Sequence, residues 1–311
     1  DLGREGAHGE PREDRRHELP AAADPSAYRL TILRSPTNLG FAEGQNAVMD
    51  YALDEARADY FIELNNDTEV DAQFVEGLLQ VFAQGSPDGR VKPEEVGNVG
   101  PIAQGLVDGR RTERITYYGG RFPARSLFRS QLIRGHEPEV QRDVAEVDLV
   151  VGAASAFSAK ALRSVGGYDP RLFAYGEELD ITVRLREAGY RSLVTRHSTI
   201  WHAGGRTSQG IRQAFRTEQS IKNTVLNVRK HAILRQPASL IREAMAIGLA
   251  TARSFRQAFR TRDWRYAVAP LRGLWDGLCG RFSDAQVGTL ERGVGRAEGR
   301  SRRILALEQK V

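Results

Sequence analysis

The sequence predicts an α/β protein with a mixed sheet flanked by helices, followed by a basic helical region. Three observations predict this class. Short apolar runs alternate with amphipathic segments through roughly the first two thirds of the chain, as they do in layered α/β proteins. Polar clusters stand directly after apolar runs, at the points where strands would end. Beyond residue 205, apolar side chains recur at helical spacing among many arginines.

The composition excludes wholesale disorder and leaves ample apolar material for a core. Of the 311 residues, 41% are hydrophobic and 27% are charged, both ordinary proportions for a globular chain. The sequence contains nothing near the roughly 18 consecutive apolar residues of a membrane-spanning helix. The one cysteine, Cys279, cannot form an internal disulfide, and such sparse cysteine usage is typical of a reducing compartment.

The first part of the chain is predicted to alternate between strands and helices. Residues 1–27 are rich in Gly, Pro, Arg and Glu and show almost no apolar periodicity, so we expect a mobile segment there. Asn38 begins a turn that enters a helix. In chain order we expect a strand over 28–33, a helix ending near Ala58, a strand over 60–64 and a helix over 70–84.

The middle of the chain is less regular. Residues 85–147 combine Gly, Pro and charged clusters, and we expect a loop-rich, substrate-facing region there. Beyond it we expect a strand over 148–157, a helix over 159–165, a turn over 166–170, a helix from Glu177 to near Gly189, and strands over 191–195 and 198–201. We expect long helices from Arg206 onward and a charged helix over 290–311. The predicted organisation is a mobile segment (1–27), an α/β core (28–205) and a basic amphipathic helical region (206–311).

The net charge of +5 conceals a strong asymmetry. Residues 206–311 carry 21 basic and 8 acidic side chains, a formal charge of +13, whereas residues 1–205 carry −8. Of the 45 basic residues 40 are arginine, whose planar fork suits phosphates and anionic headgroups. The acidic part could hold a metal ion, and the basic part could meet an anionic surface.

A first candidate site is the cluster Asn65, Asn66 and Asp67, which follows the apolar run 60–64. Ligands of open α/β sheets bind just beyond the carboxyl ends of strands. A carboxylate at that place can hold Mg²⁺ or Mn²⁺, which would bridge to phosphate oxygens. The alternative is a turn, completed by Thr68, that caps the helix that follows.

A second candidate site lies at a predicted helix start, where Glu177, Glu178 and Asp180 stand within four residues. The helix dipole stabilises anions there, and crowded carboxylates raise at least one pKa, which suits a general base. The alternative is ordinary acid enrichment at a helix start, with a surface ion pair between Asp180 and Arg184.

A third candidate is His202, which follows Trp201 at a predicted strand end and precedes Gly204 and Gly205. A histidine in such a place can be a metal ligand or a phosphate contact. A lone histidine with neither role is the alternative.

The order and spacing of these motifs resemble glycosyltransferase family 2. The motifs that carry the resemblance are Asn38-Leu-Gly-Phe-Ala-Glu-Gly-Gln-Asn46, Leu64-Asn-Asn-Asp-Thr68, Val151-Gly-Ala153, Gly166-Gly-Tyr-Asp169, Tyr175-Gly-Glu-Glu-Leu-Asp180 with Arg184, Gly189-Tyr190 and His202. They extend over about residues 30–230, and the branch most similar in character is the rhamnosyltransferase-like one that builds bacterial surface polysaccharides.

The resemblance implies a GT-A fold, in which a Rossmann-like sheet binds a nucleotide sugar and a divalent metal, Mg²⁺ or Mn²⁺. Asp67 matches the last acid of the Asp-x-Asp metal motif, whose first acid is Asn65 here, and His202 matches a position that completes the metal site in some relatives. Glu178, paired with Glu177, matches the catalytic base, with Asp180 as the fallback. Matches to the nucleotide site are Asn38, Gly40, Asn46, Asn65, Asn66 and Asp67. Matches to the sugar and acceptor pocket are Gly152, Gly167, Asp169, Glu177 and Arg184.

The activity implied is inverting, metal-dependent transfer of a sugar from a dTDP-, UDP- or GDP-sugar to a glycan or polyprenyl-linked acceptor in cell wall or surface polysaccharide synthesis. The acceptor hydroxyl needs a positioned base, and the leaving diphosphate needs charge neutralisation. The implied location is cytoplasmic, with peripheral contact of the basic helices to an anionic membrane surface on the inner face. The alternative, to which we give equal weight, is that these helices pack back on the core with a solvated basic face, and the two are compatible. No recognised motif indicates nucleic acid.

The chain departs from the family pattern at its start. The family opens with an apolar strand, a helix and a second strand that hold the nucleotide, and residues before Tyr28 are polar and Gly-rich. We therefore expect that the sequence begins partway through a longer gene product. A second hypothesis is a non-catalytic GT-A-like interaction protein at a membrane assembly. A third, a nucleotidyltransferase, lacks a Gly-rich basic phosphate loop.

Overall fold

The computed structural model describes residues 30–121, 131–133, 138–203, 211–231, 237–282 and 305–309. The described residues fall into two compact units. One is the antiparallel pair of β1 (Leu30–Arg34) and β11 (Leu305–Gln309). The other contains every element from α1 (Gly40–Asp50) to α7 (Arg265–Leu278). The predicted mobile segment 1–27 lies outside the described residues.

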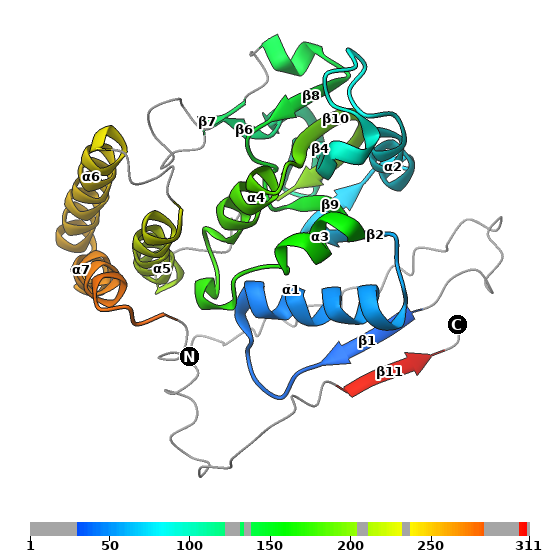
Figure 1. The fold of residues 1–311 in the computed structure, drawn as a ribbon. Helices are drawn as coiled ribbons and strands as arrows, with labels where there is room; N and C mark the ends of the chain where they lie inside the picture. Colours follow the sequence, from blue (N-terminus) through cyan, green and yellow to red (C-terminus); the bar gives the residue numbers. More distant parts are fainter. Residues whose placement is uncertain are drawn as a thin grey trace, which may run out of the picture. The chain divides into compact units, whose positions relative to one another are not determined.

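A seven-stranded mixed sheet forms the centre of the larger unit (Figure 1). Its strands are β2 (Tyr60–Leu64), β3 (Thr68–Val70), β4 (Val96–Val107), β5 (Arg110–Tyr117), β8 (Val144–Val147), β9 (Ala154–Ser158) and β10 (Arg191–His202). The main order is β2-β9-β4-β10-β3, with β5 beside β4 and β8 beside β10. Strand β9 is antiparallel to both β2 and β4, and β10 is parallel to β4. Strands β2, β4 and β10 therefore run in the same direction.

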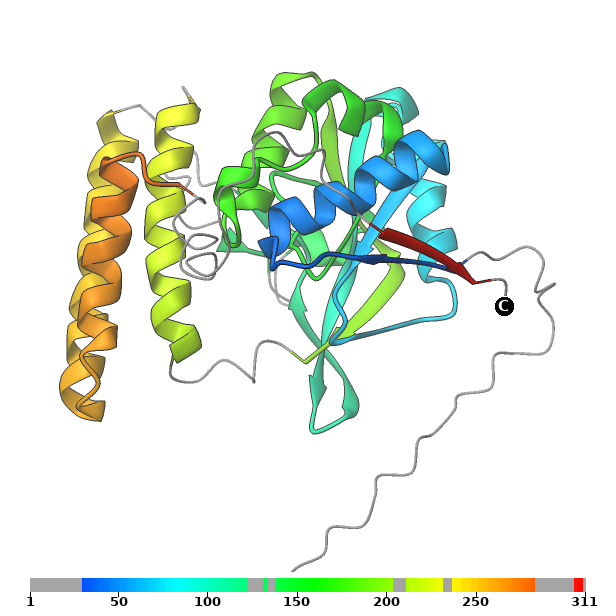
Figure 2. The same cartoon turned by 90° about the horizontal axis from the view of Figure 1, so that it is seen from below.

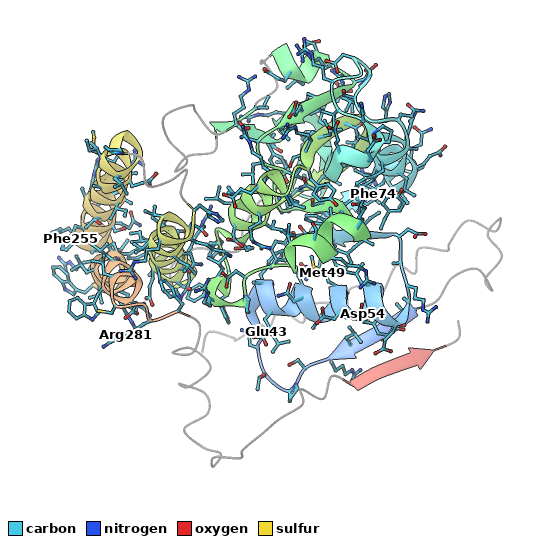
Figure 3. The ribbon with its side chains drawn as sticks, viewed as in Figure 1. Glu43, Met49, Asp54, Phe74, Phe255 and Arg281 are labelled. Atoms are coloured by element: carbon cyan, nitrogen blue, oxygen red, sulfur yellow. The ribbon has the colours of Figure 1, made fainter. Side chains whose placement is uncertain are left out.

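Helices cover both faces of this sheet, because successive strand residues point to opposite sides. On one face α2 (Phe74–Gln84) packs Phe74, Leu78 and Val81 onto the strands. On the other, α1, α3 (Ala159–Val165) and α4 (Glu177–Glu187) share a second core. Phe74 and Met49, labelled in Figure 3, belong to these two separate cores.

Shorter elements connect these layers. Strands β6 (Gly120–Arg121) and β7 (Gln131–Leu132) form a small antiparallel pair. A π-helical turn over Tyr51–Glu55 continues α1, and 3₁₀ turns span Pro93–Glu95, Pro138–Gln141 and Pro170–Leu172. The last of these turns leads into the segment that precedes α4.

Three long helices complete the unit: α5 (Ile211–Lys230), α6 (Pro237–Thr261) and α7. Both views place α5 between the sheet and the α6–α7 pair (Figures 1 and 2). Glycines on α7 permit a close approach to α5, since a Cβ on Gly273 would overlap the backbone of Glu218. Within the described residues, the search for a helix that could cross a bilayer finds none.

The predicted α/β class, with a mixed sheet flanked by helices and a helical C-terminal region, is confirmed. The predicted strand over 60–64 and helix over 159–165 match β2 and α3 to the residue. The helix expected from Glu177 is α4. The two strands expected over 191–195 and 198–201 are one long strand, β10, with a register shift between Thr195 and Thr199.

The expectation of a loop-rich region over 85–147 is wrong for much of that range, since it contains β4, β5 and β8. The glycines of β4 make its sequence resemble that of a loop, but in the structure they leave room for neighbouring side chains. A Cβ on Gly97 would press on Tyr190, and one on Gly100 would press on Val150. Small residues are needed wherever a neighbouring side chain lies directly against the strand.

Two further predicted elements differ from the helices and strands of the structure. The helix expected over 70–84 begins only at Phe74, because Asp71 turns back to accept hydrogen bonds from the backbone N–H groups of Gln73 (2.9 Å) and Thr199 (2.6 Å). Within the predicted helix over 290–311, residues 305–309 form strand β11, which pairs with β1 through a register that sequence periodicity could not reveal. The remainder of that range lies outside the described residues.

Candidate active site

The carboxyl ends of β2 and β10 lie at the same edge of the sheet, because the two strands run in the same direction. Asp67 follows β2, and His202 ends β10. Strand β3 pairs antiparallel with β10, with Thr68 opposite His202, and the Ala203 N–H donates to the carbonyl of Asp67 at 3.3 Å. This register brings Oδ1 of Asp67 to 3.2 Å from Nε2 of His202.

The turn between β2 and β3 is anchored by its backbone. The Asn65 N–H donates to the Ala153 carbonyl at 3.0 Å, and the Thr68 hydroxyl donates to the Asn65 carbonyl at 2.6 Å. The turn leads into a strand, so the alternative that it caps a helix is wrong. Asn66 and Asp67 are exposed at the sheet edge, where a ligand could reach their side chains.

Glu178 lies at the start of α4 and is held against the loop that precedes β9. The Gly152 N–H donates to its carboxylate, and a Cβ at position 152 would collide with that carboxylate. Burial raises the pKa of Glu178, and the Gly152 hydrogen bond and the charge of Arg216 only partly oppose the rise. Glu178 is therefore a carboxylate that can accept a proton near neutral pH.

Two more glutamates lie buried near Glu178. Burial, and then the charge of Glu178, raises the pKa of Glu177. Within the described part of the chain, Oε2 of Glu177 has no hydrogen-bond partner. Glu63, on β2, accepts hydrogen bonds from the Tyr168 hydroxyl at 2.8 and 2.9 Å. Burial raises the pKa of Glu63 to about 8. Three carboxyl groups thus share one poorly solvated region, which favours protonation of at least some of them.

Tyr117 links the two predicted acid clusters. Its hydroxyl is buried and has no hydrogen-bond partner among the residues that the structure describes. Burial raises its pKa first, and the charges of Glu178 and Asp67 raise it further. Because both carboxylates act on the same phenol, residues 67 and 178, far apart in the sequence, lie in one electrostatic neighbourhood.

Asp180 has a different environment from Glu178. It is fully buried and contacts Arg184 (2.6 Å), Lys230 (2.6 Å) and His231 (2.9 Å). Although burial opposes ionisation, the His231 hydrogen bond and the Arg184 charge lower the pKa of Asp180 below its ordinary value. A carboxylate whose oxygens are occupied and whose pKa is depressed is a poor proton acceptor. We therefore do not propose Asp180 as the base.

Asp169, Gly167 and Arg184 brace the turn between α3 and α4. Asp169 accepts hydrogen bonds from Arg171 and from Lys230, at 2.6 and 2.8 Å. Arg184 donates to the carbonyls of Val165 and Gly167, each at 2.6 Å. These polar groups, predicted for the sugar and acceptor pocket, are engaged with the protein itself.

The residues predicted to cradle the nucleotide also hold the fold together. Asn38 accepts a hydrogen bond from the Gly40 N–H at 3.0 Å, next to the start of α1. Asn46 exchanges two hydrogen bonds of 2.8 Å with the backbone of Tyr168. At Gly40, φ is +73° and a Cβ would overlap Phe173, so only glycine fits.

The segment before α4 is conformationally strained, and α5 holds it. Phe173 and Tyr175 have φ of 49° and 70°, values unfavourable for residues with a Cβ. The buried Nδ2 of Asn223 lies 2.6 to 2.8 Å from the carbonyls of Leu172, Ala174 and Tyr175. Helix α5, which belongs to the predicted basic helical region, therefore sets the backbone that delivers Glu177 and Glu178 to the site.

Replacing Asn223 by Ala is expected to lower the free energy of unfolding by about 1–3 kcal/mol, because it leaves buried carbonyls without a donor. The measurement is urea unfolding followed by circular dichroism. Gln213→Ala on the same helix is the control, since Gln213 is exposed. If the two variants have equal midpoints, the strained segment does not depend on Asn223.

Sequence reasoning missed Tyr117, Glu63, Arg216 and Asn223. The sequence did contain a sign that Glu63 is unusual, because it is the only acid within the short apolar strand Tyr60–Leu64. The other three gave none. Their roles depend on which elements pack together, and neither the register of β5 nor the docking of α5 follows from local periodicity.

The donor set at the sheet edge suits a divalent cation only in part. Asp67 offers a carboxylate and His202 an imidazole, within 3.2 Å of each other. Among the residues that the structure describes, no group of three or more His, Cys, Asp or Glu side chains is arranged to hold a metal ion. Two protein ligands fit a cation that takes its remaining ligands from water and substrate phosphates.

Comparison with known proteins gives distant relatives. No family model matches the sequence. The chain is 28% identical over 174 residues to the uncharacterized proteins Rv1525 of Mycobacterium tuberculosis H37Rv and Mb1552 of Mycobacterium bovis. The match covers 55% of this chain and 56% of each relative, so the chain spans about half the length of the curated relatives that it matches.

Among solved structures, the chain is similar to GalNAc-T7, crystallised with UDP, GalNAc and Mn²⁺. The TM-score is 0.45 at 17% sequence identity, and the similarity covers 63% of this chain and 35% of that one.

Proposed function

We propose that the chain is a GT-A-type inverting glycosyltransferase that uses a nucleotide-sugar donor. The observation that carries the proposal is that two unlike acids lie on backbone segments joined to each other. The Asn65 N–H, in the turn of Asp67, donates to the Ala153 carbonyl, and the neighbouring Gly152 N–H donates to Glu178. Asp67 stands exposed at the sheet edge beside His202, and Glu178 is half-buried with a raised pKa. One acid suits a charged ligand and the other suits proton transfer, which is the division of labour that glycosyl transfer needs.

In the proposed reaction, the Glu178 carboxylate accepts the proton of the acceptor hydroxyl. The oxygen attacks the anomeric carbon, a new glycosidic bond forms, and the bond to the diphosphate breaks. The bonding pair leaves with the nucleoside diphosphate, and the anomeric configuration inverts. The Gly152 N–H, which donates to the same carboxylate, holds it in place before and after the transfer.

Asp67 and His202 are the residues that would hold Mg²⁺ or Mn²⁺. A bound cation would neutralise the charge that develops on the leaving diphosphate. Asn65 and Asn66 offer neutral amide oxygens beside Asp67, in a turn whose backbone is anchored by Ala153.

For the substrates, we propose a dTDP-, UDP- or GDP-sugar donor and a glycan or polyprenyl-linked acceptor, in rhamnosyltransferase-like synthesis of bacterial surface polysaccharide. The order and spacing of the family 2 motifs support this proposal. We also propose action on the cytoplasmic side, at the inner face of the plasma membrane, which the basic charge of residues 206–311 supports.

Asp67→Ala is expected to remove the enhancement by Mn²⁺ of nucleoside diphosphate binding, because His202 alone is a weak site for a hard cation. Isothermal titration calorimetry with UDP, dTDP and GDP, with and without Mn²⁺, measures the effect. Glu76→Ala is the control, since it removes one exposed carboxylate from α2.

Unchanged Mn²⁺ enhancement in Asp67→Ala would contradict the metal assignment. If the folded wild-type chain shows neither metal-enhanced binding nor release of nucleoside diphosphate from any donor sugar, the non-catalytic interaction protein becomes the better account.

A further inference from the structure

Helix α7 faces α5 mainly with small residues, while its large apolar residues other than the buried Tyr266 lie on the opposite side. Ala269, Gly273 and Gly277 are buried on the side that meets α5. A Cβ on Gly273 would overlap the Glu218 carbonyl, and one on Gly277 would press on Val225. The close contact with α5 therefore uses backbone and small side chains, which leaves the bulky side chains of α7 on the opposite face.

The opposite face of α7 carries a continuous apolar row. Its members, each more than half exposed, are Trp264, Val268, Leu271, Trp275 and Leu278. Their spacing of four, three, four and three residues places them along one line of the helix. The surfaces of globular proteins do not ordinarily expose such a continuous row of apolar side chains to water. A row that includes two tryptophans therefore indicates a surface that contacts a partner.

Helix α6 extends this row. Ile241, Met245 and Phe259 are each more than 60% exposed. The Phe259 ring stands edge-on to that of Trp264, with centroids 5.3 Å apart, so the exposed surfaces of the two helices are joined at the α6–α7 corner. We name the α7 row together with Ile241, Met245 and Phe259 the outer face. In Figure 3, Phe255 marks α6, and Arg281 lies just beyond the end of α7.

Arginines interleave with the outer face. Arg253, Arg256 and Arg260 lie on the exposed part of α6, and Arg256 precedes Phe259 by three residues, which places the two side by side. None of the three forms an ion pair with another residue that the structure describes, whereas Arg265 is paired with Asp263. Apolar, aromatic and unpaired cationic side chains thus occur on the same surface.

We infer that the outer face docks onto an anionic lipid bilayer, with α6 and α7 lying in the plane of the headgroups. Exposed apolar side chains would enter the acyl boundary, tryptophans suit the interface, and arginines would contact lipid phosphates. A second copy fits less well, because a symmetric contact would bring Arg253, Arg256 and Arg260 of the two copies together. The inference rests on the membrane location in the proposed function and names the surface that makes the contact. It does not require glycosyl transfer, so vesicle binding and the Glu178 and Asp67 variants test the two separately.

The test is co-sedimentation of the full chain with phosphatidylcholine vesicles that contain or lack phosphatidylglycerol. Binding is expected with phosphatidylglycerol and is expected to weaken as salt is raised. Val268→Glu is expected to reduce partitioning about tenfold or more, because it places a charge in the acyl boundary. Val75→Glu on α2 is the matched control, since Val75 and Val268 are 51% and 55% exposed.

A second pair of variants separates charge from apolar contact. Arg256→Glu is expected to reduce partitioning by about fivefold or more, since each arginine near an anionic surface contributes about that factor. Arg114→Glu on β5 makes the same charge change at another exposed position and should leave binding intact. Equal losses in Val268→Glu and Val75→Glu, or equal binding to both kinds of vesicle, would overturn the inference. A vesicle-free dimer that Val268→Glu dissociates would also overturn it and assign the face to a second copy.

Discussion

Glu178→Gln is expected to lower the rate of sugar transfer by about 10²–10⁴-fold, because the acceptor hydroxyl loses its proton acceptor. Glutamine keeps an oxygen that can accept the Gly152 hydrogen bond, so the loop before β9 and the start of α4 should stay in place. Release of nucleoside diphosphate from dTDP-, UDP- and GDP-sugars, in the presence of acceptor, measures the effect.

Glu187→Gln is the matched control, since it makes the same change at the exposed end of the same helix. Both variants should unfold at the wild-type urea concentration. Activity of Glu178→Gln within a few-fold of wild type would remove Glu178 from the mechanism.

The pH dependence of the wild-type rate gives a second readout of the same group. Glu178 acts only when it is ionised, and burial raises its pKa. The acidic limb of the rate profile should therefore fall well above pH 4.5, the ordinary value for glutamate. In Glu178→Gln the residual rate should lose that limb.

Glu63→Gln is expected to change the pH dependence of stability strongly. Burial raises the pKa of Glu63 from 4.5 to about 8. The folded protein therefore retains a proton that the unfolded chain releases. The resulting contribution to stability is complete below pH 4.5, falls as the pH rises, and is lost above about pH 8.

Between those pH values the wild type should lose at most about 5 kcal/mol of unfolding free energy through this one group. Glutamine does not titrate, so the variant should lose none of it. At pH 5 the two proteins should be about equally stable, because the glutamine oxygen still accepts the Tyr168 hydrogen bond as the protonated Glu63 does. At pH 8 the variant should be the more stable protein, because only the wild type has lost the contribution of the protonated carboxyl group.

Urea unfolding of both proteins at a series of pH values measures this difference. Glu55→Gln, at an exposed position, is the control and should follow the wild type throughout. Parallel curves for wild type and Glu63→Gln would mean that Glu63 is ionised in the folded protein, contrary to its burial.

Local signals predicted the elements that carry the candidate site. Strand β2 is a short apolar run followed by polar residues, and α4 begins with acids that complement the helix dipole. Both elements lie where we predicted them. The assignment of Asp67, His202 and Glu178 as site residues stays a prediction, to be decided by the experiments above.

Local signals failed where glycines occur inside strands. Strand β4, at the centre of the sheet, contains Gly97, Gly100 and Gly105, which by composition indicate a loop. Its glycines accommodate Tyr190 and Val150, both more than 40 residues away in sequence. Composition reports a residue's own preferences and carries no information about which distant side chain presses on it.

The sequence alone was enough to pick out three candidate site clusters. Each is short, and its residue types, such as a carboxylate after a strand or acids at a helix start, have a local physical meaning. The family resemblance ranked Glu178 above Asp180, two positions apart, but only the folded arrangement supplies a physical reason for that order. Glu178 meets a backbone N–H in a poorly solvated place, whereas Asp180 is neutralised by Lys230 and His231 from α5 and the residue that follows it. Burial and ion pairing set the affinity of a carboxylate for a proton, and both depend on helix packing between segments some 50 residues apart.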